Sequence, residues 1–181
     1  MPNMKRSLII LLSATLWLGY TAKAQVLTSL QEVGTPELAQ KREALKESVM
    51  TSYLGIKNSL VKSDSVGAVK FATELIANLS QFKFKKLSLE KMNEATTTRK
   101  EMIELAQSIA ATKSINKQRS EMDKLSVKMW SVIERFKPEK TSLYKQVCPM
   151  TGTTWISDDK AIQNPYYPKN MLTCGEVKAS I

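Results

Sequence analysis

Apolar residues recur at helical spacing along residues 36–138, and this pattern constrains the fold more than any other feature of the sequence. Alternating steps of three and four place such residues on one face of an α-helix. Four stripes follow one another, separated by short polar breaks. Their members are Leu38, Leu45, Val49, Tyr53, Ile56 and Leu60, then Val66, Val69, Leu75, Ile76 and Leu79, then Met92, Ala95, Met102, Leu105, Ala106 and Ile109, then Gln118, Met122, Leu125, Met129, Val132, Ile133 and Phe136. The pattern predicts an all-α fold, an antiparallel four-helix bundle over residues 36–138.

The ends of these segments carry helix-start and helix-stop residues. Pro36 suits the first position of a helix, and Asp64 is a capping residue at the break between the first two stripes. Pro138 ends the fourth helix. Between the second and third stripes, Phe82 and Phe84 alternate with lysines, and we expect these rings to close one end of the core. Methionines at helical spacing within the stripes are predicted to fill the core.

Residues 139–181 differ in composition from the helical part. Three prolines and two glycines forbid a long helix there. Trp155-Ile156 is a candidate start of a short strand. We therefore expect an irregular, hairpin-like C-terminal appendage that packs on the bundle through Trp155, Tyr166 and Tyr167.

The N-terminal residues 1–24 have the form of a secretory signal peptide. Lys5 and Arg6 precede an apolar run over residues 8–18, and Ala22 and Ala24 supply the small residues at a cleavage site. The run is too short to span a bilayer as a stable helix. The sequence predicts a soluble exported protein, with no membrane insertion after cleavage and with a linker over residues 25–35.

Charge and composition narrow the classes of function. The full chain carries a formal charge of +10, and loss of Lys5, Arg6 and Lys23 with the signal peptide leaves +7. Export makes nucleic acid an improbable partner despite this charge. The sequence contains no histidine, which removes the commonest general base and a common zinc ligand. No glycine-rich phosphate loop occurs either, so we do not expect an enzyme.

Four sulfur-containing residues make the appendage chemically distinctive. Cys148 and Met150 lie around Pro149, and Met171 precedes Cys174 by three residues. If the tail folds back on itself, these sulfurs converge, and thiolate with thioether ligands selects soft ions such as Cu(I) or Ag(I). The alternative is a disulfide between the only two cysteines, which an exported compartment favours. It would stabilise the fold by roughly 3–4 kcal/mol in the chain-entropy model.

The tail also resembles the signature of an uncharacterised exported helical family. The residues that carry this resemblance are Tyr144, Cys148-Pro149-Met150, Trp155-Ile156-Ser157, Ile162, Asn164-Pro165-Tyr166, Met171-Leu172 and Cys174-Gly175-Glu176-Val177. Residues 53–64 and 112–126 resemble helices of the same family. Its members accompany, or are fused to, adaptor subunits of copper and silver efflux systems in Gram-negative envelopes.

The resemblance implies a periplasmic protein that binds Cu(I) or a similar soft ion through Cys148, Met150, Met171 and Cys174. It implies a carrier, buffer or accessory of a metal efflux system, with an efflux adaptor as partner. Related metal-binding segments usually carry histidine after Cys-Pro-Met, where this chain has Thr151; this departure narrows the expectation to an all-sulfur site. The rival expectation is a disulfide-stapled, non-catalytic interaction module of the cell envelope.

Processing by signal peptidase is directly testable. We expect the mature N-terminus at Gln25, because Ala22 and Ala24 occupy the two small-residue positions before it. The intact mass of exported protein measures this. A mass that still includes residues 1–24 would instead support an uncleaved membrane anchor.

Overall fold

The computed structural model describes residues 35–85 and 87–181. Residues 39–181 form one compact unit, which holds nearly all of the described chain. The predicted signal peptide and all but the last residue of the predicted linker lie outside the described residues. Among the described helices, none is both long and apolar enough to cross a membrane.

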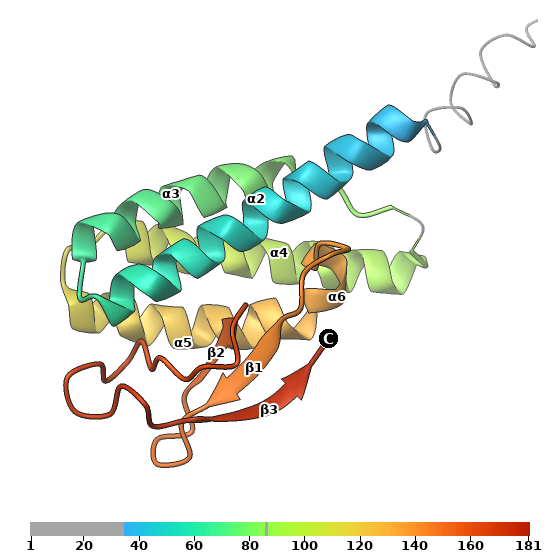
Figure 1. Ribbon diagram of the computed structural model, residues 1–181. Coiled ribbons are helices and arrows are strands. Elements are labelled where there is room, and N and C mark those ends of the chain that lie inside the picture. Colours follow the sequence, from blue (N-terminus) through green and yellow to red (C-terminus); the bar gives the residue numbers. More distant parts are fainter. Residues whose placement is uncertain (1–34, 86) are drawn as a thin grey trace, which may run out of the picture. The chain divides into compact units, whose positions relative to one another are not determined.

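The described residues form a mostly helical protein with a small sheet (Figure 1). The elements in chain order are α2 (Pro36–Val61), α3 (Ser65–Gln81), α4 (Leu89–Ala110), α5 (Ile115–Ser131), α6 (Ile133–Phe136), β1 (Tyr144–Val147), β2 (Thr154–Ser157) and β3 (Glu176–Ser180). The helical character predicted for residues 36–138 is therefore confirmed.

Capping residues fix the helix boundaries near their expected places. The Asp64 carboxylate accepts hydrogen bonds from the N–H groups of Val66 and Gly67, at 3.1 and 2.9 Å, and so satisfies the first turn of α3. The Ser88 hydroxyl does the same for Lys91 in α4. Because these donors have no partner within the helix, the side-chain oxygens determine where each helix begins.

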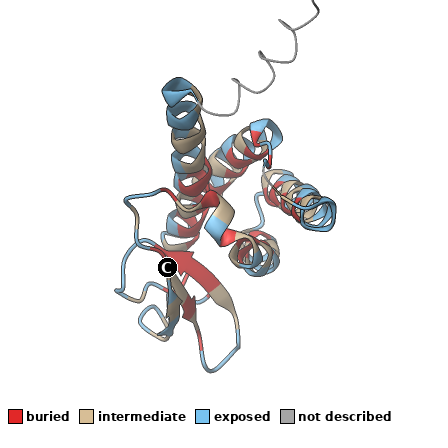
Figure 2. Ribbon diagram, turned by 90° about the vertical axis from the view of Figure 1, so that its right-hand side faces the viewer, coloured by how far each residue is buried: buried red, intermediate tan, exposed pale blue. Residues whose placement is uncertain are grey.

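The buried residues line the inner faces of the helices (Figure 2). Most stripe residues are buried as predicted, including Tyr53 and Met122. Val66 is an exception, since it is 65% exposed. The inner face of α3 contains the predicted Leu75 and Leu79 together with Ala68 and Ala72. Alanine is a weak hydrophobic signal, so a scan for large apolar residues misses the buried positions in the first half of α3.

The predicted fourth helix is divided at Val132. Its φ and ψ of −123° and 16° leave the helical region, so α5 ends at Ser131 and α6 forms a separate turn. The described part of the chain thus has five helices rather than four. The break brings Phe136 against Phe82 and Phe84, with ring centroids 4.5 and 5.9 Å away. The expectation that the two phenylalanines close one end of the core is confirmed.

The tail contains a three-stranded antiparallel sheet, so the prediction of an all-α fold with an irregular appendage was wrong for this part. The strand order is β2-β1-β3, with Tyr144 opposite both Ser157 and Ser180. The hairpin-like return of the chain and the strand start near Trp155 were expected, whereas the pairing of β1 with β3 was not. The strands are four or five residues long, too short for a clear alternating pattern, and β3 pairs with residues about thirty positions earlier.

Buried hydroxyl groups join the sheet to the helices. Tyr53 in α2 shares a hydrogen bond of 2.7 Å with Ser126 in α5, and its oxygen accepts the N–H of Ile156 at 3.1 Å. Trp155 and Tyr166 are buried as expected, whereas Tyr167 is 40% exposed. The tail is therefore an integral part of the core.

The methionines of α5 provide a test of the core. We expect Met122→Asp to lower the free energy of unfolding by about 3–5 kcal/mol, because it combines the loss of a fully buried side chain with an unpaired buried charge. The matched control is Val127→Asp on the same helix, where the side chain is 54% exposed. Denaturant unfolding measures both variants. Equal effects at the two positions would contradict the observed face of α5.

Candidate metal site

Cys148 lies directly after β1, in the turn that leads to β2. Its N–H donates to the carbonyl of Thr153 at 3.0 Å, and its carbonyl accepts the N–H of Gly152 at 2.8 Å. Gly152 has a φ of +72°, a conformation that side chains with a Cβ rarely adopt. This glycine lets the chain reverse direction within a few residues of Cys148.

Cys174 lies two residues before β3, in a loop held by one buried amide. The Asn164 side chain donates to the Cys174 carbonyl at 3.2 Å and accepts the N–H of Tyr166 at 2.9 Å. Its backbone N–H donates to the carbonyl of Leu172 at 2.8 Å. Asn164 is completely buried, so the loop is anchored where water does not compete.

Gly175 fixes the loop from the other side. A Cβ at this position would lie 2.8 Å from the Trp155 ring and 2.8 Å from the Ile162 side chain. The tryptophan is itself held by its indole N–H, which donates to the buried Gln146 side chain at 2.6 Å. The backbone beside Cys174 thus packs closely against a fixed aromatic ring.

The two cysteine sulfurs lie 3.4 Å apart, although 26 positions separate the residues in the sequence. Both are free thiols. Cys148 is fully buried and Cys174 is partly exposed. The expectation that the tail folds back to bring the cysteines together agrees with this geometry.

The surroundings shift the pKa values of the two cysteines in opposite directions. Burial raises the pKa of Cys148, but hydrogen bonds from the Thr151 hydroxyl and the Cys174 thiol outweigh it, helped by backbone N–H groups of the turn. The pKa of Cys148 is therefore lowered. The hydrogen bond with Cys148 raises the pKa of Cys174, as do burial and the nearby Cys148 charge. Of the two thiols, Cys148 therefore loses its proton more readily than Cys174.

The two methionines flank the cysteines along the chain. The backbone N–H of Met150 interacts with both cysteine sulfurs, while the Met150 side chain is 75% exposed. Met171 is half-buried, and its carbonyl accepts the N–H of Cys174 at 3.0 Å. The structure therefore brings the two thiols together, and it leaves the Met150 thioether largely in solvent.

Sequence reasoning missed the residues that position the cysteines. Asn164 was part of the tail signature, but nothing marked its side chain as buried. Gln146 gave no signal either, because a polar residue in a short segment predicts exposure.

Among the described residues, no cluster of three or more histidine, cysteine, aspartate or glutamate side chains could hold a metal. Any ion here would depend on the cysteine pair and thioethers.

Residues 49–141 match the family described as a protein of unknown function (DUF3347). The chain belongs to this family. The DUF3347 match begins within α2, includes α6 and ends three residues before β1. It therefore covers the helices from the middle of α2 onward and stops short of the sheet and both cysteines. Comparisons with curated proteins and with solved structures found no match.

The buried amide of Asn164 can be tested directly. We expect Asn164→Ala to lower the free energy of unfolding by about 1–3 kcal/mol, because buried partners lose their hydrogen bonds. It should also increase the rate at which iodoacetamide alkylates Cys174, because the loop is released. Asn170→Ala, at an exposed position of the same loop, is the matched control. Identical stability and alkylation in both variants would show that Asn164 does not hold the loop.

Proposed function

We propose that this DUF3347 protein binds Cu(I) or a similarly soft ion, such as Ag(I), at the Cys148–Cys174 pair. The observation that carries the proposal is the 3.4 Å separation of two free thiols. Two sulfurs at this distance can bind one ion after a small movement of the side chains. Thiolates select soft ions, and Cu(I) tolerates fewer ligands than zinc, whose structural sites have four.

The local electrostatics support a bound cation. Hydrogen-bond donors from the turn lower the pKa of Cys148, and such outer donors orient metal ligands and tune their basicity. Binding of the ion would displace the proton of Cys174, because the metal ligand is the thiolate. Met150 and Met171 are the candidate thioether ligands. Rotation of the exposed Met150 side chain would bring its sulfur over the pair.

The biological setting is part of the same proposal. In this proposal the long helices form an antiparallel bundle that carries the tail. The resemblance of the tail to partners of copper and silver efflux systems supports a periplasmic carrier, buffer or accessory, with an efflux adaptor as partner. The signal-peptide pattern supports export, and the proposed function is binding without catalysis.

A second candidate function rests on the same pair of sulfurs. Their proximity also suits a permanent disulfide, which would make the tail a stapled interaction module of the envelope. This alternative predicts protein without free thiols and without metal uptake after reduction.

A Cu(I) titration of reduced, mature protein tests the proposal. We expect one Cu(I) per chain in competition with a weak chromogenic chelator. Cys148→Ser or Cys174→Ser should lower the affinity by more than about 100-fold, beyond the 10–100-fold typical of outer-shell losses. Met150→Leu or Met171→Leu should lower it by about 10-fold or less, since leucine keeps the volume but removes the sulfur.

Two controls accompany this titration. Met129→Leu changes a fully buried methionine of α5 and should leave the affinity unchanged. The apparent affinity should also rise with pH below the raised pKa of Cys174, because protons compete with the ion for that sulfur. Failure of the reduced wild-type protein to take up Cu(I) would remove the metal function.

A further inference from the structure

We infer that the Cys148–Cys174 pair is a substrate for thiol–disulfide exchange, in which Cys174 reacts first with an external disulfide and Cys148 then closes the intramolecular bond. The reacting class is a disulfide donor of the exported compartment, either a protein or a small molecule. The inference uses the geometry of the pair, and it rests on the proposed function only in its last step, the exclusion of the ion.

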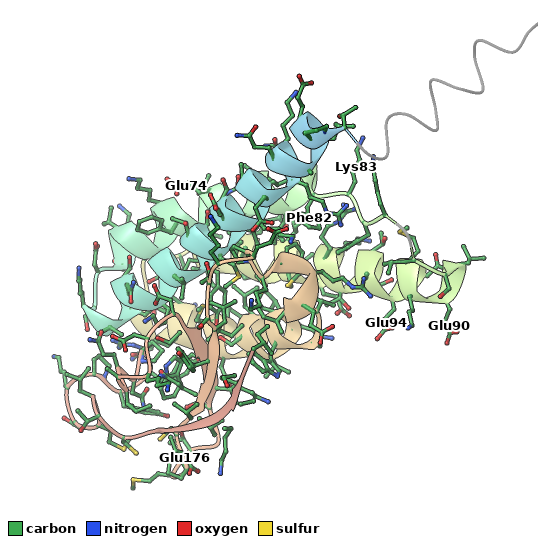
Figure 3. All side chains as sticks on the ribbon, turned by 45° about the vertical axis from the view of Figure 1, so that its right-hand side comes forward. Glu74, Phe82, Lys83, Glu90, Glu94 and Glu176 are labelled. Atoms are coloured by element: carbon green, nitrogen blue, oxygen red, sulfur yellow. The ribbon has the colours of Figure 1, made fainter. Side chains whose placement is uncertain are left out.

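The order of reaction follows from access. Cys148 is fully buried, so its sulfur cannot approach a disulfide carried by another molecule. Cys174 is partly exposed and lies in a loop at the edge of the sheet, two residues before Glu176, which lies at the side of the tail away from the helices (Figure 3). Exchange requires the attacking sulfur to reach the disulfide, so Cys174 is the point of entry.

The chemical steps balance without any further reactant. The Cys174 thiolate attacks one sulfur of the external disulfide, whose S–S bond breaks and releases one thiolate. The Cys148 thiolate then attacks the Cys174 sulfur within the mixed disulfide, and the second external thiolate leaves. Each cysteine gives up its proton to solvent as it becomes the attacking thiolate, and each released thiolate takes up a proton. Overall, the two cysteines lose two electrons and two protons, and the external disulfide gains both to become two thiols.

Two features of the fold favour the second step. The Cys148 sulfur is already 3.4 Å from the sulfur that it must attack. The loop of Cys174 is held in place by Asn164 and by the contact of Gly175 with Trp155. Since both sulfurs are positioned beforehand, ring closure should outrun dissociation of the mixed disulfide.

The bond would link the β1–β2 turn to the segment before β3. These segments already lie together, since Val147 is opposite Glu176 in the sheet. Closure therefore requires little rearrangement of the backbone. It would also remove both thiolate ligands from a metal ion, so the oxidised protein should not bind Cu(I).

Oxidised glutathione provides the probe. Reduced mature protein is mixed with it, samples are quenched with acid, and intact masses are recorded. We expect wild-type protein to lose two hydrogens without accumulating an adduct. Cys148→Ser should accumulate one glutathione on Cys174, at least about 10-fold faster than Cys174→Ser accumulates one on Cys148. In guanidinium chloride, where both thiols are accessible, the two single variants should react at similar rates.

Three results would overturn the inference. One is faster adduct formation in Cys174→Ser than in Cys148→Ser under native conditions. Another is a lasting adduct on the wild-type protein without ring closure. The third is resistance of the native wild-type protein to oxidation. Asn164→Ala, which keeps both cysteines, should slow ring closure and let the mixed disulfide on Cys174 accumulate.

Measuring oxidation and Cu(I) uptake on the same protein tests the metal function and the exchange inference independently. Cu(I)-loaded wild-type protein should be oxidised at least about 10-fold more slowly than metal-free protein, because the bound ion occupies both thiolates. Pre-oxidised protein should take up no Cu(I). If the protein closes the ring but its reduced form takes up no Cu(I), the metal function is wrong and the exchange inference stands. Cu(I) uptake without ring closure removes the exchange inference and leaves the metal function.

Discussion

The tail depends on one buried hydroxyl group in the first long helix. Tyr53 contacts Ser126 of α5 through its oxygen, and the same oxygen accepts the N–H of Ile156 in β2. The N–H of Ile156 in the sheet therefore has its hydrogen-bond partner within the helical core. Since a buried unpaired N–H is costly, the sheet is stable in this position only while the two helices present that oxygen. Burial raises the pKa of the Tyr53 hydroxyl, which keeps it neutral and able to donate.

Buried side-chain amides hold the loops of the tail in place. The side-chain oxygen of Gln146 accepts a hydrogen bond from the indole N–H of Trp155, and its side-chain nitrogen donates to the carbonyl of Asp159 at 2.8 Å. Asn164 holds the loop of Cys174 in the same way. Side-chain amides can donate and accept at once, so each joins segments that have no regular backbone pairing. A short sheet with long loops thus positions two sulfurs that are far apart in sequence.

The sequence predicted the helices well because their information is local. Stripes such as that of Met122 and Met129, together with a cap such as Asp64, are visible within a few turns of chain. The division of the last helix at Val132 and the outward position of Val66 depend on packing with other segments. The same holds for β1 and β3, whose pairing partners are remote. For the candidate site, the sequence supplied Cys148 and Cys174 as a pair, but it gave no sign that Asn164 and Gln146 would position them.

The exposed and buried members of the pair also explain why metal binding and oxidation would compete. Cys148 is buried and its pKa is lowered, while Cys174 is partly exposed and retains its proton more strongly, because its pKa is raised. A soft ion and an external disulfide would both meet Cys174 first, and both would then need the Cys148 thiolate to complete their reaction. Whichever reactant engages both sulfurs excludes the other. The ratio of soft ion to oxidant around the protein would then determine whether the tail carries an ion or a disulfide.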